Sequence, residues 1–482
     1  MKKLSILFIF ILMIININAS NAENYIIEIN SVSQSYLEVT PWQRTAIRNN
    51  AGFGVSIQGK YVLTTADVVK DSMLVELKKH GENTIWTGKV LHADYDAGLA
   101  LVIPDNMDFF NTLETPEFSD NYRIGSNIIL SRRLGDGRLA SYSGLITEIF
   151  ATRILYGSNT YIALKGSVMM QSGGNGEIIF SDGKIIGLCY SFRNNEANII
   201  PYETIKNYLT NFNTGNYRGF PANYFSRTLM NDINLRKYLK FPDELSGVMI
   251  GNYLSQMPYA SFFKQYDILL SVDGFNIDNA GLVTTEKYGK IAFNVILNLN
   301  KKPGESVNVE IFRNGKVEKH KLKLESYDKD SYLIPEHLID KRTNFIVYGG
   351  LLISELTKSF LQEYGSEWVK RGPVSLVKTY YDFFMKKSPD KNRIVVVRQV
   401  FPHDINRGYQ HIRNQVISTI NGIKIKDISD VEKALSLDVE YDVFEFEKTA
   451  FKVVFDREEV SKINHKIEET YTITESRFIE AR

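Results

Sequence analysis

A serine followed by two glycines, Ser172-Gly173-Gly174, lies near the middle of the chain, just after a hydrophobic segment. A serine hydroxyl on a glycine-rich turn can act as a nucleophile, because the glycines let the backbone bend so that N–H groups face a developing oxyanion. The tripeptide alone is weak, since it recurs by chance and usually marks only a turn. Its meaning depends on whether a base, and a group that orients the base, stand upstream.

Candidate partners for this serine precede it in the chain. Asp67 follows the apolar run Tyr61–Thr65, and Asp96 comes shortly before another apolar run. A carboxylate with a pKa near about 4 is a poor base at neutral pH, whereas an imidazole is a good one. His80 and His92 are the histidines in this part of the chain. The ordinary interpretation of each is a strand or loop residue, so neither is assigned to the site.

The composition is that of a globular protein. The 482 residues are enough for about three domains. A hydrophobic content of 44%, a charged content of 23% and a net charge of +1 provide no argument for nucleic-acid or membrane binding. Cys189 is the only cysteine, so no intrachain disulfide can form, and its apolar neighbours predict a buried, unreactive thiol. No metal cluster or phosphate loop stands out, and we expect no metal and no cofactor.

The first residues have the order of a secretory signal peptide. Lys2 and Lys3 precede an apolar run from Leu4 to Ile15, and the small residues up to Ala22 provide a cleavage site. The run is shorter than the ~20 residues that a transmembrane helix needs; an uncleaved anchor is the alternative. We therefore expect a signal peptide at residues 1–22 and export to the periplasm or cell envelope of a bacterium, which low cysteine usage also favours.

Residues 23–212 contain many short strands separated by turns. Gly52–Ile57 and Tyr61–Thr65 flank the turn Gln58–Lys60, and similar strand and turn signals recur further along. This spacing predicts an all-β barrel or sandwich, followed by a short helix that begins near Pro201.

An internal repeat follows a polar linker at residues 211–216. Asp267–Ile277 and Asn414–Ile425 each combine an apolar strand, an Asp-Gly or Asn-Gly turn and a second strand. Each also has a strand before it and a helix-like segment after it, which favours two related α+β modules over two unrelated hairpins. The expected boundaries are 215–327 and 340–460 for the modules and 461–482 for a charged, mobile tail.

Taken together, these segments resemble the HtrA/Deg family, in which a trypsin-like protease domain is followed by PDZ domains. Five stretches carry the resemblance in the family's order: Gly52–Ile57, Tyr61–Val69, Asp96–Val102, Gln171–Gly174 and Asn198–Pro201. The resemblance implies a mostly β fold with a trypsin-like double β-barrel at 23–212, followed by two α+β PDZ domains.

Three further stretches are similar to the plant-type Deg branch of this family. They are Pro41–Gln43, Phe345–Leu351 and Asp404–Tyr409. The resemblance implies that the last PDZ domain is atypical and serves assembly more than peptide capture. It also implies homo-oligomers, trimers or multiples of trimers, built through the protease domain.

The family's catalytic triad is incomplete in this chain. Ser172 stands at the nucleophile position and Gly173 follows it, but Asp67 stands where the family has its histidine. Gly98 stands where the family has its aspartate. Asp96 lies two residues earlier, displaced by about 6.6 Å along the strand, which exceeds hydrogen-bond reach unless a bulge shifts it.

The turn around the serine also departs from the family. Met170 replaces a glycine that helps to shape the oxyanion hole, and Asn175 replaces a proline. Loss of the base or the nucleophile of such a triad costs a factor of about 10⁶ in turnover. We therefore expect a pseudoprotease that binds polypeptides as a chaperone or scaffold in envelope protein quality control. An active serine endopeptidase that uses Ser172 with a rearranged base is the alternative, and a surface interaction protein is a third interpretation.

The residues Tyr217, Arg218, Gly219 and Phe220 resemble the carboxylate-binding loop at the start of HtrA-type PDZ domains. Loop N–H groups of this kind capture the C-terminal carboxylate of a peptide that adds to the sheet as a strand. An ordinary linker turn is the alternative. The resemblance implies that unfolded proteins or peptide C-termini are the partners, and no nucleic-acid partner is expected.

Overall fold

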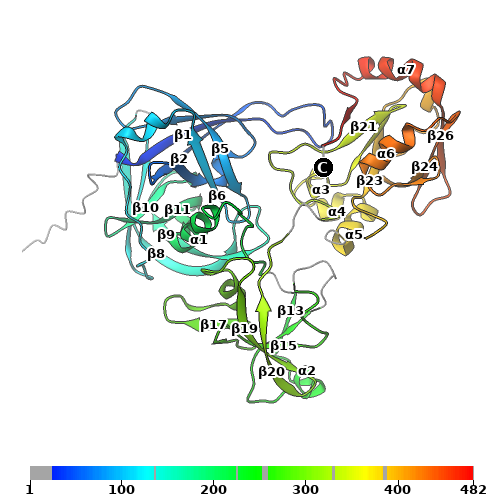
Figure 1. Ribbon diagram of the computed structural model, residues 1–482. Helices are drawn as coiled ribbons and strands as arrows, with labels where there is room; N and C mark the ends of the chain where they lie inside the picture. The colour runs from blue at the N-terminus through cyan, green and yellow to red at the C-terminus, as the bar shows by residue number, and fades with distance from the viewer. Residues whose placement is uncertain are drawn as a thin grey trace, which may run out of the picture.

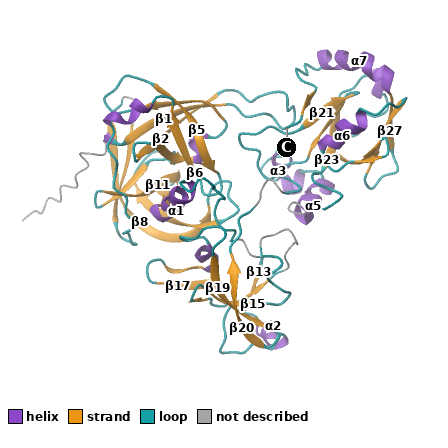
Figure 2. Cartoon of the chain, in the orientation of Figure 1, coloured by secondary structure: helices purple, strands orange, loops and turns teal. Residues whose placement is uncertain are grey.

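Strands dominate the chain, as the turn spacing predicts (Figure 2). The computed structural model describes residues 24–134, 137–223, 226–251, 259–327, 332–383 and 388–480. The expected signal peptide at residues 1–22 lies outside the described residues. No helix in the described ranges is both long and apolar enough to cross a membrane.

The N-terminal half forms two closed six-stranded barrels (Figure 1). The strand order is β1-β2-β3-β6-β5-β4 in the first barrel and β10-β11-β12-β9-β8-β7 in the second. The first barrel consists of β1 (Ile26–Ser33), β2 (Arg48–Ile57), β3 (Tyr61–Thr65), β4 (Ser72–Lys78), β5 (Trp86–Asp94) and β6 (Leu99–Pro104), with the 3₁₀-helices η2 (Ala66–Val69) and η3 (Met107–Thr112). The second consists of β7 (Asn127–Arg133), β8 (Leu139–Arg153), β9 (Thr160–Val168), β10 (Ile178–Ser181), β11 (Lys184–Arg193) and β12 (Glu196–Pro201), followed by helix α1 (Tyr202–Phe212).

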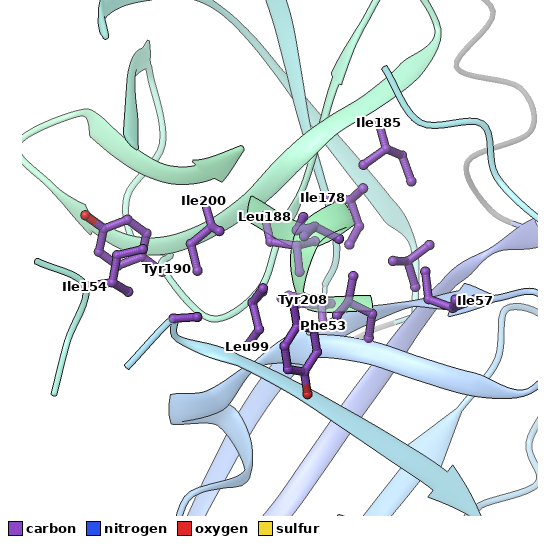
Figure 3. Close-up of a cluster of buried hydrophobic side chains, with 14 of the residues drawn as sticks. Phe53, Ile57, Leu99, Ile154, Ile178, Ile185, Leu188, Tyr190, Ile200 and Tyr208 are labelled. Atoms are coloured by element: carbon purple, nitrogen blue, oxygen red, sulfur yellow. The ribbon is translucent and has the colours of Figure 1, made fainter. Parts of the chain in front are cut away.

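Buried apolar side chains hold the two barrels together. Each barrel has its own core, and a further cluster takes side chains from both barrels and from α1. Figure 3 shows part of this shared cluster, in which Phe53 and Leu99 of the first barrel lie near Leu188 and Ile200 of the second and Tyr208 of α1. The two barrels therefore share a continuous apolar core.

The middle module is a sheet in the order β13-β14-β15-β19-β20, with β16 paired to β15 and a separate β17–β18 hairpin. Its elements are β13 (Arg227–Leu229), α2 (Ile233–Tyr238), β14 (Val248–Ile250), β15 (Ile268–Val272), β16 (Phe275–Asn276), β17 (Leu282–Thr285), β18 (Gly289–Ala292), η4 (Phe293–Leu297), β19 (Ser306–Arg313) and β20 (Lys316–Lys323). The helix-like segment expected after the Asp-Gly turn is a hairpin and a short 3₁₀-helix instead. All five residues of η4 are buried, so packing rather than helical periodicity determines this segment.

The hairpin of the middle module holds the barrels through a buried carboxylate. Glu203 of α1 accepts hydrogen bonds from the hydroxyls of Tyr122 and Tyr288, at 2.8 and 3.1 Å, and pairs with Lys287. Glu203 is almost fully buried, and a buried carboxylate needs such partners to offset its lost hydration.

The C-terminal module is built on a larger sheet, in the order β27-β26-β24-β23-β22-β21-β28. Its elements are β21 (Phe345–Tyr348), β22 (Leu351–Glu355), α3 (Lys358–Gln362), α4 (Trp368–Arg371), α5 (Val374–Phe383), β23 (Val395–Val400), η6 (Asp404–Asn406), β24 (Gln415–Ile420), β25 (Ile423–Lys424), α6 (Ile428–Leu435), β26 (Tyr441–Phe446), β27 (Lys452–Asp456), α7 (Arg457–Thr470) and β28 (Arg477–Phe478). The predicted mostly β fold with two closed barrels at its N-terminal end is thus confirmed.

The expectation of a mobile tail at 461–482 is wrong for its described part. Helix α7 covers residues 461–470 of this stretch, and β28 adds to the sheet edge with Phe478 opposite Phe345. Val460, Ile467 and Ile473 are buried, so an apolar stripe holds the helix and the following turn against the module despite the many charges.

A hairpin-like excursion between β1 and β2 reaches from the first barrel to the C-terminal module. Trp42 at its tip is buried between the rings of Phe345 and Phe401, with centroid distances of 5.9 and 5.8 Å. Nearby, the buried Arg398 guanidinium donates a hydrogen bond to the carboxylate of Glu38, 3.1 Å away. The excursion therefore fastens the last module to the barrel.

Candidate functional site

The loop that carries Ser172 and the short helix that carries Asp67 meet at the same place on β2. Phe53 N donates to Asn175 O at 2.8 Å. A side chain at Gly52 would lie 2.5 Å from Val68 and 2.7 Å from Asn175 O, so both segments press against this glycine. The structure thus brings the loop of the predicted nucleophile and the short helix of Asp67 together against β2.

Asp67 is exposed on η2 and is engaged by a tyrosine rather than by the serine. The Tyr156 hydroxyl donates to Asp67 Oδ1 at 3.0 Å, and Lys70 Nζ donates to the same hydroxyl at 3.0 Å. Burial raises the pKa of Tyr156 and the Asp67 carboxylate adds to this, although Lys70 opposes it. Tyr156 therefore stays protonated at neutral pH and cannot replace the missing imidazole. Neither Tyr156 nor Lys70 was predicted, because nothing in their local sequence marks them.

Gly98, at the position of the family's aspartate, is enclosed by apolar side chains. Its φ is +71°, in the left-handed region that favours glycine. A Cβ at this position would lie 2.5 Å from Ile154 Cγ2 and 3.2 Å from Ile200 Cδ1. Figure 3 shows Ile154 beside Tyr190 and Ile200 within the buried cluster. The space that a triad carboxylate would need is therefore filled by packed hydrocarbon.

Asp96, predicted to lie near the aspartate position, binds the segment before β9. Its Oδ2 accepts hydrogen bonds from Asn159 Nδ2 and the Tyr161 hydroxyl, each at 2.7 Å, and its Oδ1 accepts from the backbone N–H of Ser158 and Asn159. Only 7% of Asp96 is exposed. Its acceptors are used to hold this loop, which leaves Asp96 with an architectural role.

His92 lies in an aromatic cluster with Tyr208 and Tyr217. Its Nδ1 is 2.8 Å from the Tyr208 hydroxyl, and its ring packs 4.4 Å from the ring of Tyr217. Burial lowers the pKa of His92, and the nearby Asp94 only partly offsets this. A neutral, packed imidazole on β5 agrees with its interpretation as an ordinary strand residue.

A buried carboxylate holds the turn after Ser172. Glu177 Oε2 accepts hydrogen bonds from Gly174 N at 2.9 Å and Asn175 N at 2.8 Å. Burial raises the pKa of Glu177, while the backbone donors and Arg132 oppose this. Arg132 Nη1 lies 3.9 Å from the other carboxylate oxygen and donates to the Ser172 carbonyl at 2.6 Å. Glu177 was missed in the sequence, although a glutamate directly before the apolar run of β10 is a visible signal.

The Met170 side chain packs beneath the residue that follows the serine. A Cβ at Gly173 would lie 2.4 Å from Met170 Cε and 2.8 Å from Glu177 Oε1. The turn is thus held from inside by a methionine and a carboxylate. Two of its backbone N–H groups, those of Gly174 and Asn175, donate to Glu177.

The stretch predicted to bind carboxylates lies against the barrel. The Tyr217 hydroxyl donates to Asp94, and Phe220 is buried with its ring 5.2 Å from that of Tyr161. Arg218 is exposed and Gly219 is half-buried between them. The two aromatic residues therefore join the middle module to the protease-like domain, and the peptide-binding role of this stretch stays a prediction.

In the described part of the chain, no group of three or more His, Cys, Asp or Glu side chains could hold a metal ion. Cys189 is buried, and burial raises the pKa of its thiol well above the ordinary value. A reactive thiolate is therefore not available near the Ser172 loop.

Comparison with known proteins gives a consistent picture along most of the chain. A family model described as a PDZ domain matches residues 334–478. Putative protease Do-like 3, mitochondrial, of Arabidopsis thaliana is 25% identical over 421 residues, covering 86% of this chain and 72% of that protein. Protease Do-like 2, chloroplastic, of the same plant is 24% identical over 446 residues, covering 91% and 72%.

Solved structures agree in fold. A variant of the HtrA-type protease AlgW with a decapeptide has a TM-score of 0.50 and 13% sequence identity, covering 65% of this chain and 97% of that one. At this identity the similarity speaks for the arrangement of the elements alone.

Proposed function

Because the chain belongs to the HtrA/Deg (protease Do-like) family, with a trypsin-like protease domain and a PDZ domain, we propose that it is a pseudoprotease of that family. It binds unfolded or C-terminal polypeptide segments without hydrolysing them. The observation that carries this proposal is the apolar enclosure of Gly98 by Ile154 and Ile200, which leaves no room for a triad carboxylate.

The remaining groups of the site support the same conclusion. In the serine mechanism a base takes the hydroxyl proton and returns it to the leaving amine. Asp67 is exposed and its carboxylate accepts a hydrogen bond from the Tyr156 hydroxyl, and a carboxylate is in general a much weaker base than the imidazole that this mechanism uses. With both the base and its orienting carboxylate replaced, the expected loss is on the order of 10⁶ in turnover.

One observation favours the alternative, a serine endopeptidase with a rearranged base. Ser172 is exposed, and in the described ranges no group is hydrogen-bonded to its hydroxyl. A nucleophile would need this accessibility. It would also need a base within about 3 Å, a role that the described contacts of Asp67 do not supply.

The compartment and assembly are part of the proposal. The order of charged, apolar and small residues at 1–22 supports export to a bacterial envelope. The matching PDZ model supports peptide binding, since such domains add an extended peptide to a sheet edge. Family membership supports homo-oligomers built through the barrel domain.

A serine-reactive fluorophosphonate probe tests the proposal. We expect no covalent labelling of the wild type or of Asp67→His, because the imidazole would lack an orienting carboxylate, with Ser172→Ala as the blank and an active trypsin as the positive control. Labelling of the wild type that Ser172→Ala abolishes would establish the endopeptidase instead. Peptide binding is measured separately, by anisotropy of a fluorescent unfolded protein.

A further inference from the structure

The first barrel is closed by a short seam between β4 and β5. Only three residue pairs join these strands, with Val75 opposite Gly88, Glu76 opposite Thr87 and Leu77 opposite Trp86. Beyond this point residues 72–74 pair only with β1, and residues 89–94 pair only with β6. Two strand edges therefore diverge, and each has a side that is not paired in the sheet.

Two β-bulges account for the divergence. On β4 the register with β1 shifts so that Met73 is the extra residue, and on β5 the register with β6 shifts so that Leu91 is the extra residue. A bulge bends its strand and ends regular pairing. The bulged residues are also apolar and exposed, with 60% of Met73 and 42% of Leu91 accessible. The barrel thus presents an apolar side chain on each edge of the opened seam.

A cavity of about 570 Å³ occupies this opening. Its walls are residues 72–75 of β4 and 88–93 of β5, with Tyr36 and Arg44 from the excursion after β1 and Asp340 from the start of the C-terminal module. This volume lies in the range of ligand pockets. A five-residue extended segment, about 17 Å long, matches the open edge of residues 89–93.

The charged side chains that line the cavity differ in whether they have polar partners. Arg44 donates to the Tyr36 hydroxyl at 2.7 Å and contacts the sulfur of Met73 at 2.9 Å, and in the described ranges its guanidinium has no carboxylate partner. At the other end, Asp71 and Asp340 accept each other's backbone N–H, at 2.8 and 2.7 Å. The carboxylates of Asp71 and Asp340 are occupied by these hydrogen bonds, whereas the guanidinium of Arg44 is available to a carboxylate of a bound segment.

We propose that this seam binds an extended segment of an unfolded polypeptide, which adds as a strand to β5 at residues 89–93. The segment places apolar side chains on Met73 and Leu91 and a carboxylate against Arg44. The inference rests on the proposed binding of unfolded chains and assigns that binding to the wall of the first barrel, at a cavity whose lining includes neither Ser172 nor any residue of the middle module. Backbone hydrogen bonds between the segment and β5 provide the affinity. The contacts with Met73, Leu91 and Arg44 provide a preference for segments with apolar and acidic side chains.

The test uses the full chain and a fluorescein-labelled, reduced and carboxymethylated α-lactalbumin as the unfolded probe. We expect Met73→Glu/Leu91→Glu to weaken binding at least about tenfold, because two apolar contacts are lost and an acidic pair faces an acidic probe. The matched control is Met107→Glu/Ile124→Glu, whose side chains are 47% and 60% exposed elsewhere on the barrels; its affinity should equal that of the wild type. Circular dichroism and the melting temperature of each variant verify folding, and Arg44→Gln provides a second variant that leaves the apolar edge intact.

Hydrogen exchange locates the contact independently of any variant. Bound probe should slow exchange at residues 89–93. Equal affinity in the seam variant and the wild type, or protection confined to other segments, would overturn the assignment to the seam while leaving the binding function in place. Failure of the wild type to bind the probe would overturn both. A concentration-dependent dimer of the free chain that the seam variant abolishes would assign the surface to a second copy and contradict the proposal.

Discussion

Replacement of Gly98 by alanine tests whether the triad position is sterically closed. Gly98 combines a left-handed backbone, with φ +71°, and a Cβ direction that meets Ile154 Cγ2 at 2.5 Å. Alanine is the smallest residue that probes both constraints. A side chain large enough to carry a carboxylate must meet them as well.

The expected loss of stability has two parts. An alanine in the left-handed region costs about 1–2 kcal/mol. Forcing a methyl group into packed side chains costs about 1–3 kcal/mol more. Gly98→Ala should therefore lower the free energy of unfolding by about 2–5 kcal/mol.

Gly81 is the matched control, because its φ of +69° is nearly the same but nothing lies within 4 Å of its Cβ position. Gly81→Ala should cost only the backbone part, about 1–2 kcal/mol. Urea unfolding of both variants, followed by circular dichroism, measures the difference. Adding Ile154→Ala to Gly98→Ala should recover part of the loss, seen as non-additivity of about 0.5–3 kcal/mol in a double-mutant cycle. Equal losses for Gly98→Ala and Gly81→Ala would refute the steric closure of the triad position.

Two further predictions follow from the buried groups. Burial raises the pKa of Glu177 above its ordinary value of 4.5, so the folded chain holds this proton more tightly than the unfolded chain, and the contribution to stability declines as pH rises through the folded pKa. Glu177→Gln removes this dependence: in urea titrations between pH 4 and pH 8 the variant should lose less stability than the wild type, and a larger loss in the variant would contradict the assigned direction. Trp42→Ala should cost about 3–5 kcal/mol of packing and release the C-terminal module from the barrel. Small-angle scattering would then show a larger radius of gyration, and an unchanged radius would mean that Trp42 does not fasten the module.

Much of the fold could be predicted because strand and turn signals are local. Alternating apolar runs and turns such as Asn421-Gly422 predicted an all-β barrel or sandwich and two α+β modules, whereas the double barrel and the PDZ domain were implied by the family resemblance. The prediction of a mobile tail was wrong because it gave more weight to the charged residues of the tail than to the spacing of its apolar residues. Val460, Ile467 and Ile473 recur at intervals that suit a packed helix and turn.

The site was predictable only in part, for the same physical reason. Ser172 and Asp67 could be located from their flanking motifs, and the structure packs their segments against the same part of β2. The partners that determine what the site can do come from distant strands. Tyr156 reaches Asp67 across 89 positions of sequence, and Ile154 closes the space at Gly98 from the second barrel. No local pattern encodes such contacts.

The same limitation applies to Asp96 and Glu177. Short spacing to Gly98 made Asp96 a candidate for the triad, yet its carboxylate is turned toward Asn159 and Tyr161. Glu177 holds the Ser172 turn through backbone N–H groups, which depends on the conformation of the turn and not on its composition.

The central claim, that the chain binds unfolded polypeptides but does not cut them, is tested most directly by one incubation. Wild type and Ser172→Ala are each mixed with the carboxymethylated probe, and intact probe and fragments are counted by mass spectrometry over several hours. We predict that the probe stays intact and co-elutes with both proteins to the same extent. Fragments that form with the wild type and are absent with Ser172→Ala would contradict the account.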